Sequence, residues 1–234
     1  MSRQSPEANA ALRRERQKQI IDAALTVYIE CGFHGADIDL IAQRAGLAKG
    51  LVYYYYPTKL GLFRALFESC LERIIAIERD ILDSLSGLPP VESLVRYLQG
   101  FIGTSRDEPL LLRFAVRLPF DAFAVFGEAG WKKGLRKANI HQRSLATLVK
   151  NALRDQGLES PDPERAAAAL WAVIIAGLLD YVSMTGARKA GATRTRKGDR
   201  DVINQYLGFC LRGLSIRDKA WQSLLDTHLT PEAR

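Results

Sequence analysis

Two glycines and one proline divide the beginning of the chain into segments whose apolar residues recur at helical spacing. Gly32 ends the first segment, Gly46 ends the second and Pro57 ends the third. Asp37 stands before the second segment, where its carboxylate can accept hydrogen bonds from the free N–H groups of a helix start. Glycine directly after a helix favours the left-handed residue that often ends one. The sequence therefore predicts a longer helix, a short helix, a glycine turn and a second short helix.

This order of elements is that of a helix-turn-helix unit with a supporting first helix. The expected bounds are 13–31, 38–45 and 48–56, and a long helix restarts after Pro57. Glycine and proline clusters separate further helical patterns, and Pro119 is expected to kink or split one of them. These patterns lie near 90–104, 109–126, 129–156, 163–185, 200–213 and 215–228. Since no strand pattern is recognised, the predicted fold class is all-α.

The third predicted helix carries side chains that suit contact with DNA, which needs groups at base edges and others at phosphates. Lys49 can reach a guanine edge or a phosphate, Gly50 lets the backbone approach closely, and Leu51 can contact a thymine methyl group. Gln43 and Arg44 are candidate outer contacts. A tyrosine-rich helix that only packs in a core is the alternative interpretation, and the glycine turn before the helix favours the DNA-reading one.

The stretch from Ile20 to Phe63 resembles the TetR family of bacterial transcriptional regulators. The matching residues are Gly32-Phe33, Ile41-Ala42, Ala45-Gly46, Lys49-Gly50, Tyr53 and Lys59. The resemblance implies an all-α homodimer with an N-terminal three-helix DNA-binding domain and a C-terminal helical domain that binds a small ligand and dimerises. It makes Tyr53 a contact to phosphate or base, Tyr54 and Tyr55 surface contacts, and Tyr56 a core residue.

The chain departs from the family pattern at three places. It has Ala48 where the family often has serine, Leu51 where it often has threonine, and Tyr54-Tyr55 where an aromatic–histidine pair is frequent. The two hydroxyl groups normally cap the helix or touch phosphate, so the family's DNA contacts do not transfer unchanged. Lys59 opens the next helix, where cationic charge and free N–H groups both favour a phosphate.

The expected domains are a flexible tail over 1–12, a helix-turn-helix DNA-binding domain over 13–59 and a helical effector-binding and dimerisation domain over 60–234. A ligand pocket has mostly apolar walls and a few polar anchors. The candidate lining residues are Phe101, Phe114, Arg117, Phe120, Phe123, Trp131 and Trp171. Packing in the core is the alternative for each aromatic residue, and solvent exposure or a buried ion pair with Asp180 is the alternative for Arg117.

The helices expected over 163–185 and 200–213 would form the dimer bundle that the resemblance implies. Small residues on both allow close approach of the helices, and large apolar side chains supply area to bury. The candidate interface residues are Leu170, Ile174, Gly177, Leu178, Tyr181, Tyr206, Phe209 and Gly213. Packing within one chain is the alternative for these residues.

A net charge of +7 favours a polyanionic partner, of which nucleic acid is the usual one. Most of the excess lies in residues 186–200, which are rich in arginine and lysine and poor in apolar side chains. This segment is expected to be a disordered loop, and a second phosphate-contacting arm is the alternative. The net charge therefore says little about the remainder of the chain.

Other classes of function find no support in the sequence. No catalytic motif and no metal-ligand spacing is recognised, so the chain is not expected to be an enzyme or to hold a metal or cofactor. No signal peptide and no apolar run of membrane-spanning length is recognised, which predicts a cytoplasmic protein without membrane contact. The three cysteines, Cys31, Cys70 and Cys210, lie in helical patterns and are expected to be reduced and buried.

The resulting hypothesis is a ligand-responsive transcriptional regulator. It would be a repressor that binds a palindromic double-stranded DNA operator as a homodimer and is released by a small-molecule effector. Three alternatives stay open. An effector-independent architectural DNA-binding protein would have a filled C-terminal core, an apolar-ligand carrier would retain a helix-turn-helix without DNA function, and a regulator of this kind can also activate transcription.

Overall fold

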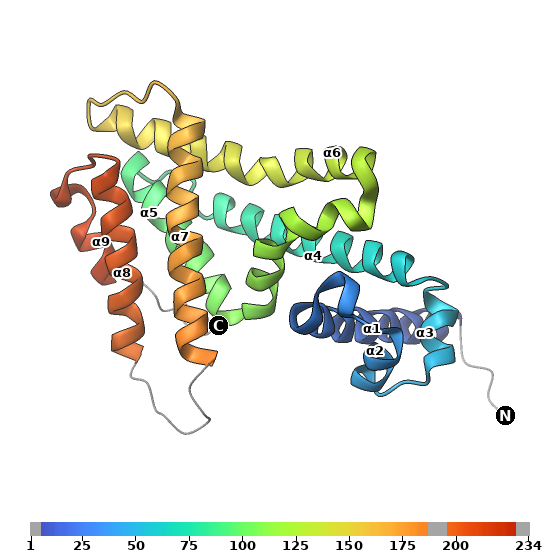
Figure 1. Ribbon diagram of the computed structural model, residues 1–234. Coiled ribbons are helices and arrows are strands. Elements are labelled where there is room, and N and C mark those ends of the chain that lie inside the picture. Colours follow the sequence, from blue (N-terminus) through green and yellow to red (C-terminus); the bar gives the residue numbers. More distant parts are fainter. Residues whose placement is uncertain (1–5, 187–195, 228–234) are drawn as a thin grey trace. The chain divides into compact units, whose positions relative to one another are not determined.

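The computed structural model describes residues 6–186 and 196–227, and these residues form helices joined by turns, with no strand among them (Figure 1). The predicted all-α fold class is thereby confirmed for the part of the chain that the structure describes. In chain order the elements are α1 (Pro6–Gly35), α2 (Ile38–Ala45), α3 (Lys49–Tyr55), α4 (Lys59–Asp83), α5 (Pro90–Asp107), α6 (Pro109–Asp155), α7 (Pro163–Gly186), α8 (Arg196–Gly213), the 3₁₀ turn η1 (Asp218–Ala220) and α9 (Gln222–Thr227).

Two compact units divide the chain. Unit 1 comprises Met1–Arg73 with Leu110–Gly134, and unit 2 comprises Ile74–Pro109 with Leu135–Arg234. The boundaries fall inside α4 and α6, so both helices contribute to both units. The functional boundary expected after residue 59 stays a prediction, because the compact unit that holds α1, α2 and α3 continues into α4 and takes in the first part of α6.

The first helix is longer than its sequence pattern indicates. α1 begins at Pro6 instead of Arg13, and proline is tolerated there because the first N–H groups of a helix have no partner within it. Its predicted end at Gly32 is confirmed: the backbone leaves helical geometry there with φ 72°, which glycine adopts without steric cost. Cys31, next to this break, is exposed, so the expectation of a buried thiol is wrong at that position, while the other two cysteines are buried.

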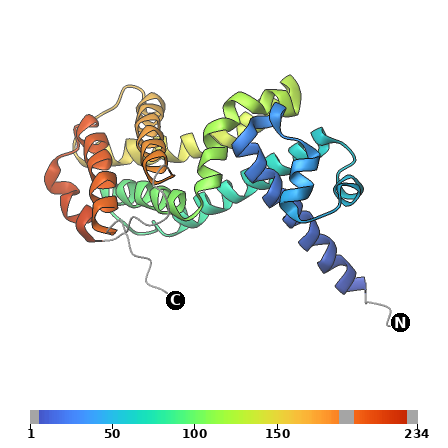
Figure 2. The same cartoon turned by 60° about the horizontal axis from the view of Figure 1, so that its bottom comes forward.

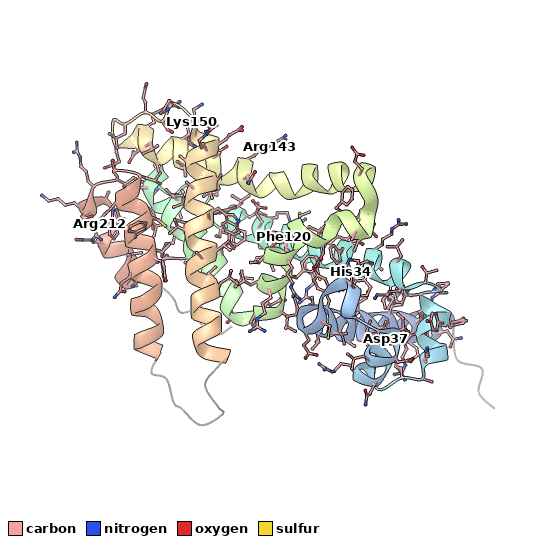
Figure 3. The ribbon with its side chains drawn as sticks, in the orientation of Figure 1. His34, Asp37, Phe120, Arg143, Lys150 and Arg212 are labelled. Atoms are coloured by element: carbon pink, nitrogen blue, oxygen red, sulfur yellow. The ribbon has the colours of Figure 1, made fainter. Side chains whose placement is uncertain are left out.

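α2 begins and ends as predicted. Asp37 is its N-cap and accepts a hydrogen bond from the backbone N–H of Asp39 at 3.2 Å, and Figure 3 shows Asp37 at the start of the helix. Gly46 follows the last residue with φ 65°, and the N–H of Leu47 reaches back to the carbonyl of Ala42 at 2.9 Å. This left-handed glycine turn sets the direction in which the chain enters α3.

An aromatic cluster fills the core of unit 1. Tyr28 of α1 is fully buried, and its ring centre lies 5.3 Å from that of Phe67 in α4 and 6.0 Å from that of Phe114 in α6. Phe67 and Phe114 are 4.9 Å apart, and the three rings meet edge-on or tilted, as aromatic pairs prefer. The first part of α6 is thus packed onto α1 and α4, which support the two short helices.

The later helices follow the predicted pattern with two differences. In α6 the backbone leaves helical geometry at Gly127, where φ is 68°, as the sequence predicts; Pro119, where a kink or split is also expected, lies within the helical stretch. The single helix expected over 215–228 is instead the turn η1 followed by α9, and Ser215 with φ 61° lies in the turn before them.

Unit 2 holds α7 and α8 side by side (Figures 1 and 2). Gly177 of α7 faces the ring of Tyr206 in α8 so closely that an ideal Cβ at Gly177 would lie 2.7 Å from a ring carbon. The short helix α9 is held by side chains of α5 and α8. The side-chain amides of Gln99 and Asn204 donate to the carbonyls of Leu224 and Leu225, at 3.3 and 3.4 Å. Of the basic segment 186–200, predicted to be a disordered loop, residues 187–195 lie outside the described residues. Residues 196–200 form the start of α8, so the loop prediction is wrong there.

Replacing Gly177 by alanine is expected to lower the free energy of unfolding by about 1–2 kcal/mol, because the added methyl group has no room against Tyr206. Chemical denaturation followed by circular dichroism measures the change. Gly103→Ala in α5 is the matched control, since an added Cβ there meets nothing within 4 Å and should leave stability equal or higher. Equal stability of the two variants would contradict the close approach of α7 and α8.

Candidate nucleic-acid interface

α3 has one buried side and one exposed side. Val52 is fully buried and fixes the helix to unit 1, while Lys49 and Gly50 are exposed at its start. Tyr53 is 41% exposed and Tyr54 is 73% exposed, which is unusual for large aromatic residues outside a binding surface. The exposed side of α3 therefore offers an ammonium group, bare backbone and two aromatic rings to a partner.

The remaining predicted DNA contacts lie beside this surface. Leu51 and Tyr55 are half-buried, and Gln43 is exposed near the end of α2. The ring of Tyr55 stands edge-on to that of Tyr54 with 5.3 Å between their centres. Tyr56, expected in the core, is also only half-buried, and burial raises the pKa of its hydroxyl.

Lys49 is paired within the unit. Its Nζ lies 2.6 Å from Oδ1 and 2.8 Å from Oδ2 of Asp39, in the first turn of α2. The hydrogen bond to Asp39 raises the pKa of the Lys49 ammonium. Both side chains are more than half exposed, so water screens the pair. The cation that opens the candidate reading helix therefore has a carboxylate beside it, which the sequence analysis did not foresee.

Arg44 has a carboxylate partner as well. Its two terminal nitrogens donate to the two oxygens of Glu30 in α1, at 2.9 and 2.8 Å. This bidentate contact raises the pKa of Arg44 and lowers that of Glu30. The pair links the end of α2 to α1 on the surface of unit 1.

Lys59 makes contacts that fix the fold. Its Nζ donates to the backbone carbonyl of His34 at 3.1 Å, close to the end of α1 where Figure 3 shows His34. The same ammonium lies 5.3 Å from the ring centre of Phe33 and 5.9 Å from that of Phe63. A phosphate contact by Lys59 stays a prediction, and these contacts give the side chain a structural role in joining α4 to α1.

The start of α3 has no side-chain cap. Ala48 occupies the N-cap with φ −67° and ψ 140°, the backbone geometry of a capping residue, but offers no oxygen. Its backbone carbonyl accepts from the N–H of Leu51 at 2.9 Å. The sequence departure from serine therefore leaves a helix start whose geometry would accept a hydroxyl.

Ala48→Ser is expected to raise the free energy of unfolding by about 1 kcal/mol, because the serine oxygen can accept from an N–H of the first turn. Urea denaturation of the full chain measures this gain. Ala48→Val provides the comparison, since valine adds bulk and no acceptor. A gain that valine reproduces would contradict capping as its cause.

Gln19 is a further residue that sequence reasoning missed. Its side-chain amide donates to the carbonyl of Ala45 at 2.6 Å, and its oxygen accepts from Arg16 at 2.8 Å. Ala45 is the last residue of α2, so Gln19 ties α1 to the glycine turn and orients Arg16 beside it. Long-range contacts of this kind have no local sequence signal.

Comparison with known proteins places these features in a family. A model described as bacterial regulatory proteins, tetR family, matches residues 20–66. The HTH-type transcriptional regulator BetI of Vibrio vulnificus is 27% identical over 193 residues, which covers 82% of this chain and 90% of BetI.

Residues 20–66, which hold the helix-turn-helix unit, belong to the TetR family of bacterial regulatory proteins.

Two solved structures share the fold of this chain. A TetR-like transcriptional regulator from Rhodococcus sp. RHA1 aligns with a TM-score of 0.64 and 22% identity over 92% of this chain and all of that one. The regulator FadR of Bacillus subtilis, solved in complex with stearoyl-CoA, aligns with a TM-score of 0.56 and 18% identity, over 84% of this chain and 96% of FadR. At these identities the likeness shows the fold alone.

The residues predicted to line a ligand pocket fall into two groups. In unit 2, Phe101 and Trp171 come together, with 5.2 Å between ring centres. In unit 1, Phe114 is buried against Tyr28, and Arg117 donates to backbone carbonyls of α1.

Two further pocket candidates are exposed, Phe120 by 81% and Phe123 by 57% (Figure 3 labels Phe120). The side chain of Trp131 lies outside the described residues. A single pocket made of all seven residues stays a prediction, and Phe114 and Arg117 already have partners within unit 1.

The residues predicted for a dimer interface lie on α7 and α8. Leu170, Ile174 and Leu178 are buried within the single chain, and Gly177 packs on Tyr206. Phe209 is 66% exposed on α8, Gly213 at its end is also exposed, and the side chain of Tyr181 lies outside the described residues. Phe209 is therefore the candidate with apolar area available to a second chain.

The described residues offer no group of three or more histidine, cysteine and acidic side chains that could hold a metal ion. Within the same part of the chain, every helix is too short or too polar to cross a bilayer.

Proposed function

We propose that this TetR-family regulator is a repressor that binds a palindromic operator as a homodimer and is released by a small-molecule effector. The exposed side of α3 carries the proposal, because Lys49, Gly50, Tyr53 and Tyr54 are presented to solvent on a helix that follows a glycine turn. In helix-turn-helix proteins the second helix enters the major groove with its first residues at base edges. The full set of proposed DNA contacts is Gln43, Arg44, Lys49, Gly50, Leu51, Tyr53, Tyr54, Tyr55 and Lys59.

The paired cations favour sequence-specific binding over an architectural role. Non-specific binding draws its affinity from lysine and arginine that neutralise phosphates. Arg44 and Lys49 are each held by a carboxylate, and Lys59 by a carbonyl and two rings. Since moving each of them to a phosphate would break an existing contact, this surface is poorly suited to binding all DNA alike.

The proposed effector site lies in unit 2, around Phe101 and Trp171. Their edge-on rings, with Tyr97 tilted against Phe101 at 5.1 Å, supply the apolar wall that small ligands need. The fold relative FadR of Bacillus subtilis was solved with stearoyl-CoA. A ligand with an apolar chain is therefore the first class to screen.

Selection of bound duplexes from a random library tests the proposal. The full-length protein is incubated at near-physiological salt, and enriched sequences are read after several rounds. Two inverted half-sites with centres about 34–36 Å apart, or a multiple of that, are the expected result. No enrichment, together with binding that vanishes as salt rises, would overturn operator recognition in favour of an architectural protein.

The effector and the sign of regulation are tested with the selected site. A reporter gene behind the operator should be silenced by the protein and restored by a ligand that also lowers DNA affinity in vitro. Coupling of about 1–3 kcal/mol, a shift of several-fold to about a hundredfold in affinity, is expected. Increased transcription in the presence of the protein would instead identify an activator.

A further inference from the structure

The contact between Asp39 and Lys49 joins the two helices of the helix-turn-helix unit at its exposed side. Asp39 is in the first turn of α2 and Lys49 is the first residue of α3. Both oxygens of the Asp39 carboxylate lie within hydrogen-bonding distance of the Lys49 ammonium, at 2.6 and 2.8 Å. The side chains are 58% and 52% exposed, so a partner that meets the start of α3 meets both groups.

We propose that Asp39 determines the sequence specificity of DNA binding. Asp39 and Lys49 together contact one G·C base pair, and Asp39 keeps Lys49 from contacting a phosphate. The proposal rests on the proposed operator binding. An ammonium has three donors and a carboxylate has about four acceptor positions, so the pair keeps both a donor and an acceptor for DNA. In the major groove guanine presents the acceptors O6 and N7, and its partner cytosine presents the N4 donor. The pair therefore matches the G·C edge with both of its halves.

A phosphate is a poor alternative partner for Lys49. If the ammonium moved from Asp39 to a phosphate, the carboxylate would be left unpaired beside the negatively charged backbone. Lys49 can bind a neutral base edge without leaving Asp39, because the ammonium has three donors and can donate to both. The intact pair has no net charge, so it should release no counterion and should add nothing to the salt dependence of binding.

The side chain of Asp39 is not needed to start helix α2. The helix cap of α2 is Asp37, whose carboxylate binds the backbone N–H of Asp39, so the side chain of Asp39 is not the cap. An asparagine in place of Asp39 keeps size and an acceptor oxygen but removes the charge that holds the ammonium. Asp39→Asn therefore separates the electrostatic role from the helical fold.

The experiment compares full-length wild-type protein and Asp39→Asn on the selected operator and on a random duplex, over a series of salt concentrations. In the Asp39→Asn protein, Lys49 is released to the backbone, so the slope of log affinity against log salt is expected to steepen by about 0.9 on the random duplex. Affinity for the random duplex should rise, and the preference for the operator should fall about tenfold or more. The discrimination at one G·C position should be the part that is lost.

Asp39→Asn/Lys49→Ala, which removes both charges of the pair and leaves no unpaired carboxylate, provides the second variant. If the pair reads a base, this change weakens operator binding and leaves the salt slope equal to that of the wild type. A slope that becomes shallower by about 0.9 would show that Lys49 contacts a phosphate, and would overturn the proposal. An Asp39→Asn protein with unchanged slope and unchanged preference would overturn it as well.

Asp162→Asn is the matched control for loss of a negative charge. Asp162 is exposed and pairs with Arg165 at 3.2 Å in unit 2, away from the helix-turn-helix helices in the sequence and in its own compact unit. It should leave slope and preference unchanged. The experiment distinguishes failure of operator binding from failure of the role of Asp39. If the protein does not select an operator, the proposed function fails. The salt dependence of binding to the random duplex still shows whether Asp39 restrains Lys49.

Discussion

Tyr53→Ala is expected to weaken operator binding by about tenfold to a hundredfold, which corresponds to about 1.4–2.8 kcal/mol. Tyr53 stands next to the buried Val52 that fixes α3, and 41% of the residue is open to a partner. Its position is therefore set by the fold before DNA arrives, and loss of the ring removes both apolar contact and a hydroxyl donor. Electrophoretic mobility shift or fluorescence anisotropy with the selected operator measures the change.

One further variant shows which part of the Tyr53 side chain acts, and a second serves as the control. Tyr53→Phe removes only the hydroxyl, so an effect near that of Tyr53→Ala would assign the loss to a hydrogen bond, and a small effect would assign it to the ring. Phe120→Ala is the matched control, because Phe120 is an 81% exposed aromatic residue of the same unit on α6. Equal losses in Tyr53→Ala and Phe120→Ala would contradict a DNA contact at α3, and gel filtration checks that the oligomeric state is retained.

The helix-turn-helix unit could be predicted because its signals are local. Asp37 caps the helix that follows it, and Gly46 adopts the left-handed φ that a turn of this kind needs. Each of these requirements involves residues within one or two turns of the chain. The break at Gly127 was predictable for the same reason, since glycine tolerates the φ of 68° that separates two helical stretches.

The partners of the candidate site residues could not be predicted, because they depend on contacts across helices. Phe101 and Phe114 look alike in sequence, each an aromatic residue in an apolar helical pattern. Yet Phe101 meets Trp171 in unit 2, whereas Phe114 packs on Tyr28 in unit 1. Periodicity shows which side of a helix is buried and leaves open which helix covers it.

The ion pairs on the candidate DNA surface were also not predicted from the sequence, although their partners are closer together along the chain. Asp39 and Lys49 are ten positions apart, and Arg44 and Glu30 are fourteen apart. Once the helix-turn-helix geometry is assumed, the first pair lies at the junction of its two helices and could be inferred. The second requires the packing of α1 against α2, which the sequence pattern does not specify.

Arg117→Met is expected to lower the free energy of unfolding by about 2–4 kcal/mol, because one side chain holds the end of the long part of α1. Its Nη1 donates to the backbone carbonyls of Tyr28 and Ile29, at 2.8 and 2.9 Å. These carbonyls precede the break at Gly32, where α1 stops supplying N–H partners in helical register. Methionine keeps much of the apolar length of the side chain and removes the donors, so the loss reports on the hydrogen bonds.

The hydroxyl of Tyr28 makes a second polar contact between α1 and α6. It donates to Oδ2 of Asp121 at 2.8 Å, and burial together with this carboxylate raises the pKa of the phenol, so Tyr28 stays protonated. Asp121 and Arg117 are one turn apart on α6, and both bind Tyr28, so α6 holds α1 by two opposite charges. Tyr28→Phe should therefore destabilise the protein less than Arg117→Met, since it removes one hydrogen bond and leaves the contacts of Arg117 in place.

Urea unfolding of Arg117→Met, Tyr28→Phe and the double variant decides whether the contacts act together. A double variant that costs less than the sum of the two single changes would show that Tyr28 and Arg117 belong to one network. Arg143→Met, an exposed arginine on the part of α6 that belongs to unit 2, should stay within about 0.5 kcal/mol of the wild type. If Arg117→Met changed the free energy of unfolding as little as Arg143→Met, Arg117 would not hold α1, and it would again be a candidate polar anchor of the ligand pocket.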